Sequence, residues 1–205
     1  MIILMKTGPY NPFRSKLNKY HSYGLITLQQ YDPPLDVKAM EACLTNIKID
    51  LAGVDYLLTS NLKRASQTAQ YLKNAGIIRP NIPVGNKFFC SLLNEVKFDL
   101  RAFCSQAEYE AQGSVIVRQR FITGFINDNL AETRRYLKQR FARLAKEIFQ
   151  LQQRHQNILC VSHTFFIKLY GIYQERPDLF EHPQIIKNYI DPAKRIMDFC
   201  ETIVF

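Results

Sequence analysis

The sequence predicts an α/β fold, a three-layer α/β/α sandwich around a mostly parallel central sheet. Short apolar runs at Ile2–Met5, Val54–Leu58, Asn157–Val161 and Glu201–Phe205 indicate buried strands. Segments with helical spacing of apolar residues alternate with these runs. Such alternation is typical of parallel sheets whose two faces are covered by helices.

Asp36 is expected to cap the first helix, whose apolar residues Val37, Met40, Leu44 and Ile47 recur at helical spacing. A second helix is expected at about 62–75, with Gly76 placed to close it. Further helical segments are expected at about 106–111, 115–126, 132–153 and 165–173. Short extended pieces are expected near 82–84 and 88–89, and a long loop at 9–24.

The composition is that of a globular chain: of 205 residues, 47% are hydrophobic and 22% are charged. One domain spanning 1–205 accommodates this length. No apolar run approaches the ~18 residues of a membrane span, and the apolar start is too short for a secretory signal. Five scattered cysteines without Cys-x-x-Cys spacing predict free thiols, a cytoplasmic location and no metal site or cofactor.

Most of the net charge of +9 lies in residues 118–154, which contain nine Lys or Arg and three Asp or Glu. The same stretch carries an apolar stripe at helical spacing, so we interpret it as a solvated outer helix. A surface for nucleic acid or another acidic partner is the alternative interpretation. No nucleic-acid-binding motif supports that alternative, so a nucleic-acid partner is disfavoured.

Polar residues follow three predicted strands, and ligands bind at the carboxyl ends of strands in such sheets. The candidates are Lys6, Thr7, Arg64 and His163, with Glu95 in the irregular segment between them. Each residue alone has an ordinary explanation as surface charge or as a structural histidine. Their convergence predicts an anion pocket, in which a planar guanidinium holds two oxygens and Lys6 acts as a point charge.

A specific motif follows the second predicted strand: Thr59-Ser60-Asn61-Leu62-Lys63-Arg64-Ala65-Ser66-Gln67-Thr68-Ala69. It is similar to Ser-x-Leu-x-Arg-Ala-x-x-Thr-Ala, a signature of the histidine phosphatase (phosphoglycerate mutase-like) superfamily. The sequence resembles this superfamily from residue 2 to about 170. Three further segments are similar in order and spacing: Asp32-Pro33-Pro34-Leu35, Leu93-Asn94-Glu95 and Asn157-Ile158-Leu159-Cys160-Val161-Ser162-His163.

The resemblance implies roles for these residues and one departure. It implies that Arg64 and His163 bind phosphate, with Lys6 and Arg14 beside them, and that Glu95 is the candidate acid. The family reads Arg-His-Gly after the first strand, and its histidine attacks phosphorus. Here Lys6-Thr7-Gly8 stands at that place, so Thr7 occupies the nucleophile position. A threonine hydroxyl is neutral at pH 7 and needs an adjacent base.

The leading hypothesis is therefore a degenerate histidine phosphatase that binds phosphate, a phosphorylated small molecule or a phosphoprotein with catalysis lost or very weak. The alternative is an active phosphomonoesterase or phosphohistidine phosphatase with a substitute nucleophile, either His21 or His163. A further alternative is a scaffold that binds a partner or nucleic acid through the basic 118–154 region.

Overall fold

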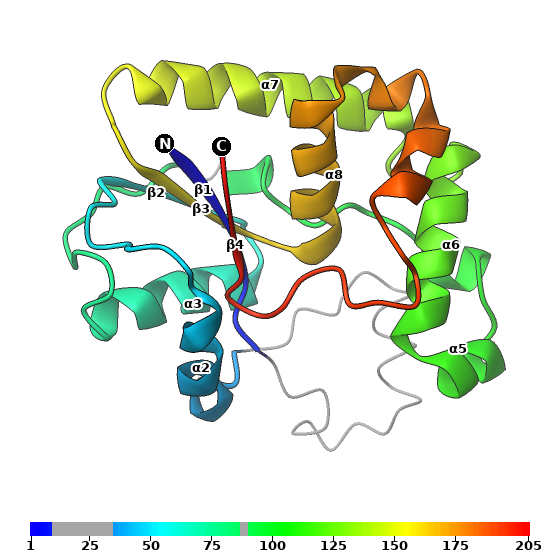
Figure 1. The fold of residues 1–205 in the computed structure, drawn as a ribbon, viewed down its shortest axis with the longest axis horizontal. Helices are drawn as coiled ribbons and strands as arrows, with labels where there is room; N and C mark the ends of the chain where they lie inside the picture. The colour runs from blue at the N-terminus through cyan, green and yellow to red at the C-terminus, as the bar shows by residue number, and fades with distance from the viewer. Residues whose placement is uncertain (10–34, 87–89) are drawn as a thin grey trace.

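A four-stranded sheet runs through the part of the chain that the structure describes, with strand order β2-β3-β1-β4 (Figure 1). The structure is a computed structural model that describes residues 1–9, 35–86 and 90–205. β1 (Ile2–Lys6), β2 (Tyr56–Thr59) and β3 (Ile158–Ser162) are parallel. β4 (Thr202–Val204) runs antiparallel to β1 at the edge of the sheet. The predicted, mostly parallel sheet is confirmed.

The register of the sheet brings three strand ends to the same edge. Lys6 lies opposite Ser162 in the β1–β3 pair, and Thr59 lies opposite Val161 in the β2–β3 pair. Backbone hydrogen bonds continue one residue further: the N–H of Thr7 donates to Ser162 O at 2.9 Å, and the N–H of Ser60 donates to Val161 O at 2.8 Å. The residues that follow the strands are therefore neighbours.

One face of the sheet is covered by α2 (Val37–Cys43), a following 3₁₀ turn (Leu44–Asn46) and α3 (Lys63–Asn74). Asp36 caps α2 as predicted, since its carboxylate accepts from the N–H groups of Lys38 and Ala39. The apolar stripe of α2 is shorter than expected. Met40 is buried, whereas Val37 is 61% exposed.

The opposite face is covered by α7 (Arg134–Gln152) and α8 (Thr164–Glu175), with α5 (Gln106–Gln112) and α6 (Ser114–Ile126) beside them (Figure 1). The predicted stripe of α7 is buried at Leu137, Phe141, Leu144 and Ile148. Each face of the sheet thus has its own apolar core. Together with the sheet, these two helical layers form the expected three-layer α/β/α arrangement.

The expected extended piece near 82–84 forms no strand. Only Val84 pairs with the sheet, as an isolated parallel bridge to Leu57. Pro83 lacks an N–H to continue the ladder, which explains the short pairing. The piece at 88–89 and nearly all of the loop at 9–24 lie outside the described residues. In the described part of the chain, no helix is both long and apolar enough to cross a membrane.

Three short 3₁₀ segments complete the chain: Leu100–Ala102, Pro177–Phe180 and Pro183–Asn188. The last of these packs against α6. The segment that follows it crosses from α6 to the sheet and ends in β4 (Figure 1). This crossing brings residues 191–200 close to the end of β1, where the candidate site lies.

Candidate functional site

Lys6, the last residue of β1, is buried with 9% of its surface exposed. Its ammonium donates to Met197 O at 2.7 Å and lies 4.5 Å from the centre of the Phe199 ring. Burial, the largest cause, together with the charges of Arg195 and Arg64 lowers the pKa of Lys6 to about 8. Near neutral pH this ammonium is a cation with few compensating contacts, so it favours an anionic neighbour.

Arg64 connects the first and third strand ends. It is the second residue of α3, whose N-cap is Leu62. Its Nε donates to Thr7 Oγ1 at 3.0 Å, and its Nη2 lies 3.4 Å from His163 Nδ1. Arg64 therefore contacts two other predicted site residues, Thr7 and His163.

The hydrogen bonds of Ser60 identify the tautomer of His163. Ser60 Oγ accepts from the N–H of Leu62 at 3.1 Å and donates to Asn94 Oδ1 at 2.9 Å. Asn94 Oδ1 is an acceptor, because it also receives the backbone N–H of Asn61 at 2.8 Å. Ser60 has only one proton, so His163 Nε2, 2.9 Å away, must carry the proton of that contact. The neutral ring thus keeps its lone pair on Nδ1, facing Arg64.

The surroundings of His163 disfavour its protonated form. The residue is 2% exposed. Burial lowers its pKa well below 6.5, and the positive charges of Arg64, Arg140 and Lys6 act in the same direction. His163 is therefore neutral at physiological pH in this structure, with Nδ1 available as a base, an acceptor or a nucleophile.

Glu95 lies at the N-terminus of α8. Its Oε1 accepts from the N–H groups of Val96 at 3.0 Å and Phe166 at 2.8 Å, and its Oε2 accepts from Phe165 at 3.4 Å. Burial raises the pKa of Glu95, although these donors and the charge of Arg64 favour the carboxylate. A carboxyl group with a raised pKa beside a cationic cavity fits the chemistry of a proton donor.

A cavity of about 310 Å³ is lined by Lys6, Arg64 and Glu95, whereas Thr7 and His163 are not in its lining. Two further cations line this cavity, Arg118 of α6 and Arg195, and neither was predicted as a site residue. Arg118 belongs to the basic 118–154 stretch, which was interpreted as a helix surface. Arg195 carries no local signal, because it lies in a C-terminal segment without a motif. The cavity thus has four cationic side chains and one carboxyl group in its lining.

A buried ion pair anchors the segment that carries Asn94 and Glu95. Arg140 of α7 donates from Nη1 to Glu132 Oε1 at 2.5 Å, from Nε to Leu92 O at 3.0 Å, and from Nη2 to Asn94 O. Glu132 in turn accepts from the N–H of Lys97 at 3.1 Å. Arg140 therefore belongs to the interior, and the interpretation of the basic stretch as an outer surface is wrong at this position. Its guanidinium pairs with two carbonyl groups of the irregular 92–97 segment, those of Leu92 and Asn94, which would otherwise need other donors.

Arg14 and His21 lie outside the described residues, as do Asp32, Pro33 and Pro34. Within the described ranges, no three His, Cys, Asp or Glu side chains gather in a way that could hold a metal ion.

A family model supports the relationship that these residues indicate. The model of the histidine phosphatase superfamily (branch 1) matches residues 27–188, most of the chain. The chain belongs to the histidine phosphatase superfamily. The match includes Arg64, Glu95 and His163 and begins after Lys6, Thr7 and Gly8. No curated protein sequence matches this chain.

Solved structures of this superfamily's fold are similar over nearly the whole chain. Mycobacterial glucosyl-3-phosphoglycerate phosphatase in complex with VO₃ is 13% identical, with a TM-score of 0.59 over 98% of this chain and 88% of that chain. Phosphoglycerate mutase from Bacillus anthracis is 16% identical, with a TM-score of 0.52 over 86% and 80%.

A third similar structure is a mutant phosphoserine phosphatase from Entamoeba histolytica in complex with phosphoserine. One of its histidines is replaced by alanine. It is 17% identical to this chain, with a TM-score of 0.51 over 88% of this chain and 83% of that chain. At such identities these similarities establish the α/β fold and leave the activity of this chain open.

Proposed function

We propose that this chain binds a phosphorylated ligand, a small molecule or a phosphoprotein segment, and hydrolyses it very weakly or not at all. The contact that carries the proposal is the one between Arg64, Thr7 and His163. A guanidinium and an imidazole meet there beside a cationic cavity, and the position of the expected nucleophile holds a hydroxyl. The proposed phosphate-binding residues are Lys6, Arg64 and His163, with Arg14; the proposed acid is Glu95.

The surroundings of Thr7 support the loss of catalysis. Among the described residues, its hydroxyl oxygen has one hydrogen-bond partner, the Nε of Arg64, which is a donor. In the described part of the chain, no base contacts this hydroxyl to remove its proton. A thousandfold loss of rate requires only about 4 kcal/mol of transition-state stabilisation, and the loss of a covalent nucleophile commonly costs more.

Phosphate binding has different requirements, and the charges at the strand ends support it. Lys6 and Arg64 both line the cavity, and their positive charges do not require an imidazole at position 7. The mutant phosphoserine phosphatase holds phosphoserine although one histidine is replaced by alanine. That complex supports binding without a full set of histidines in this fold.

The lone pair on His163 Nδ1 favours a second candidate, a weak phosphohydrolase in which His163 replaces the missing nucleophile. The third hypothesis, a nucleic-acid platform at 118–154, is weakened because Arg140 is buried and Arg118 lines the cavity. We also propose a cytoplasmic location, which the five free thiols support.

Thermal unfolding with inorganic phosphate or vanadate tests the binding proposal. A ligand at 100 times its Kd stabilises the fold by about 2.7 kcal/mol, so we expect a clear rise in Tm. Arg64→Gln should abolish this rise. Lys146→Gln, which removes the same charge from the exposed face of α7, should preserve it. No rise in the unaltered protein would contradict the proposal.

Release of phosphate from p-nitrophenyl phosphate tests the loss of catalysis. We expect no turnover by the unaltered protein and measurable turnover by the Thr7→His, Lys6→Arg double variant. Turnover by the unaltered protein that disappears in His163→Gln would favour the second candidate. Salt-sensitive binding of an oligonucleotide that survives Arg64→Gln would instead favour the platform hypothesis.

A further inference from the structure

The C-terminal segment between the last 3₁₀ turn and β4 forms a wall of the cavity, opposite the strand ends. This segment crosses from α6 to the sheet (Figure 1). Arg118 of α6 holds it by donating from Nε to Pro192 O at 2.7 Å, while its Nη1 donates to Ser114 Oγ at 2.9 Å. Among the described residues, no carboxylate forms an ion pair with Arg118. The guanidinium therefore keeps its charge beside the cavity.

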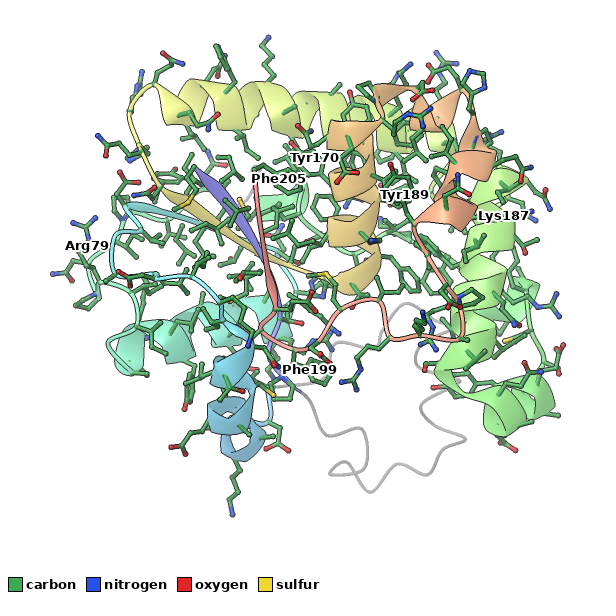
Figure 2. All side chains as sticks on the ribbon, in the orientation of Figure 1. Arg79, Tyr170, Lys187, Tyr189, Phe199 and Phe205 are labelled. Atoms are coloured by element: carbon green, nitrogen blue, oxygen red, sulfur yellow. The ribbon has the colours of Figure 1, made fainter. Side chains whose placement is uncertain are left out.

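Phe199 lies between two cations of this cavity. Its ring centre is 4.5 Å from Lys6 Nζ and 5.6 Å from the Cζ of Arg195. Figure 2 labels Phe199 where the crossing segment reaches the sheet. The Arg195 side chain is 64% exposed and pairs with Asp198 at 2.8 Å, so it stands at the mouth of the cavity. An aromatic surface thus separates a deep cation, Lys6, from an outer one, Arg195.

These cations repel one another. The charge of Arg195 lowers the pKa of Lys6 and of Arg118, in each case after the larger effect of burial. Glu95 and Asp198 offset this repulsion at Lys6 only in part, because their charges raise its pKa by less than burial, Arg195 and Arg64 lower it. A ligand with anionic groups at both ends of the cavity would relieve repulsion at both ends.

We propose that Arg118 and Arg195 bind a second anionic group of the ligand whose phosphoryl group lies on Lys6 and Arg64. The ligand class is then a small phosphomonoester that also carries a carboxylate or a second phosphoryl group. The cavity volume of about 310 Å³ suits a small molecule, and Phe199 contacts its middle part. This inference rests on the phosphate-binding function proposed above.

Matched ligand pairs measure the second group directly. 3-Phosphoglycerate and glycerol 3-phosphate differ in a carboxylate, whereas fructose 1,6-bisphosphate and fructose 6-phosphate differ in a phosphoryl group. We expect calorimetry to show that the doubly anionic member of at least one pair binds about tenfold more tightly or better. The pair that shows the preference identifies the second group as a carboxylate or a phosphoryl group.

The variants Arg195→Gln and Arg118→Gln should reduce that preference to about threefold or less. The ratio of the two Kd values is the readout, because a general loss of positive potential weakens both ligands of a pair alike. Lys194→Gln is the matched control: it removes the same charge from the neighbouring residue, whose side chain is 82% exposed and outside the cavity lining. It should leave the ratio unchanged. Arg195 is exposed, so its variant retains the fold.

Three results would overturn the inference. If inorganic phosphate binds but neither pair shows a preference, the second anionic subsite is wrong and the proposed function stands. If a preference exists but survives both arginine variants, the subsite lies elsewhere. If neither inorganic phosphate nor any of the four esters binds, the proposed function fails, and this inference fails with it.

Discussion

Arg64 Nε donates to Thr7 Oγ1 at 3.0 Å, so the arginine proposed to bind phosphate contacts a hydroxyl at the position proposed for the nucleophile. The same guanidinium lies 3.4 Å from the unprotonated nitrogen of His163. The arrangement thus places positive charge at the strand ends, and the residue that follows β1 carries a hydroxyl and no imidazole. An anion site of this kind can hold a phosphoryl group that it does not cleave.

Gly8→Ala should destabilise the protein. A Cβ at Gly8 would lie 2.5 Å from Met40 Sδ and 2.6 Å from Leu35 Cδ1, both in the core beneath α2. Overpacking of this kind costs about 1–3 kcal/mol. Urea denaturation measures the change, with Gly53→Ala as the control, because its nearest contact would be an ordinary 3.5 Å. Equal stability of the two variants would contradict the packing described for Gly8.

Arg140→Met should be more damaging than the loss of an ordinary ion pair. It leaves Glu132 charged and 97% buried at its side chain, and breaking such a pair costs about 3–5 kcal/mol. The Arg140→Met, Glu132→Gln double variant should recover part of this loss. Comparison of the three unfolding free energies tests the prediction. A double variant no more stable than Arg140→Met alone would show that the pair itself contributes little.

Sulfate binding should weaken as the pH rises through about 8. Lys6 has a pKa of about 8 because of its burial and of nearby Arg195 and Arg64, so above this pH the unoccupied site loses one positive charge. Sulfate keeps its charge over this range, which isolates the effect of the protein. Calorimetry at several pH values should show a rising Kd for the unaltered protein.

In Lys6→Arg the guanidinium stays charged, so this dependence should disappear. If the arginine does not fit the buried position, Lys6→Met should bind weakly but with the same flat dependence. A pH dependence that persists in both variants would assign the titrating group elsewhere.

Stability should fall as the pH drops below about 6.5, and His163 should account for part of that fall. The folded state lowers the pKa of His163 well below 6.5, chiefly by burial and then through Arg64, Arg140 and Lys6. At lower pH the unfolded chain therefore binds a proton that the folded chain does not, and the unfolding free energy decreases by up to about 1.4 kcal/mol per pH unit.

The variant His163→Gln has no imidazole to titrate, and the glutamine amide can still donate a hydrogen bond to Ser60 Oγ. Urea denaturation at several pH values should show a shallower slope for the variant, because the other titrating groups are common to both proteins. Identical slopes would mean that the pKa of His163 is the same in the folded and unfolded states.

Most of the site was predictable from local sequence. Lys6, Thr7 and His163 follow apolar runs that form adjacent parallel strands, and Arg64 starts a helix after the neighbouring strand. Strand order and register then require these residues to meet at one edge. Ser60 could also have been identified, since it directly follows β2. Its link to His163, however, depends on Asn94, which comes from an irregular segment.

The amino-acid sequence by itself determined the α/β pattern and the cluster of polar residues at the strand ends, because local periodicity and strand-end polarity encode these features within a few residues. Its resemblance to the family adds the prediction that Thr7 stands at the position of a histidine. Only the tertiary structure decided that Arg140 is buried, that Nδ1 of His163 is unprotonated, and that Arg118 and Arg195 share a cavity with Lys6. These features depend on contacts between residues far apart in the chain, for which neighbouring sequence carries no signal.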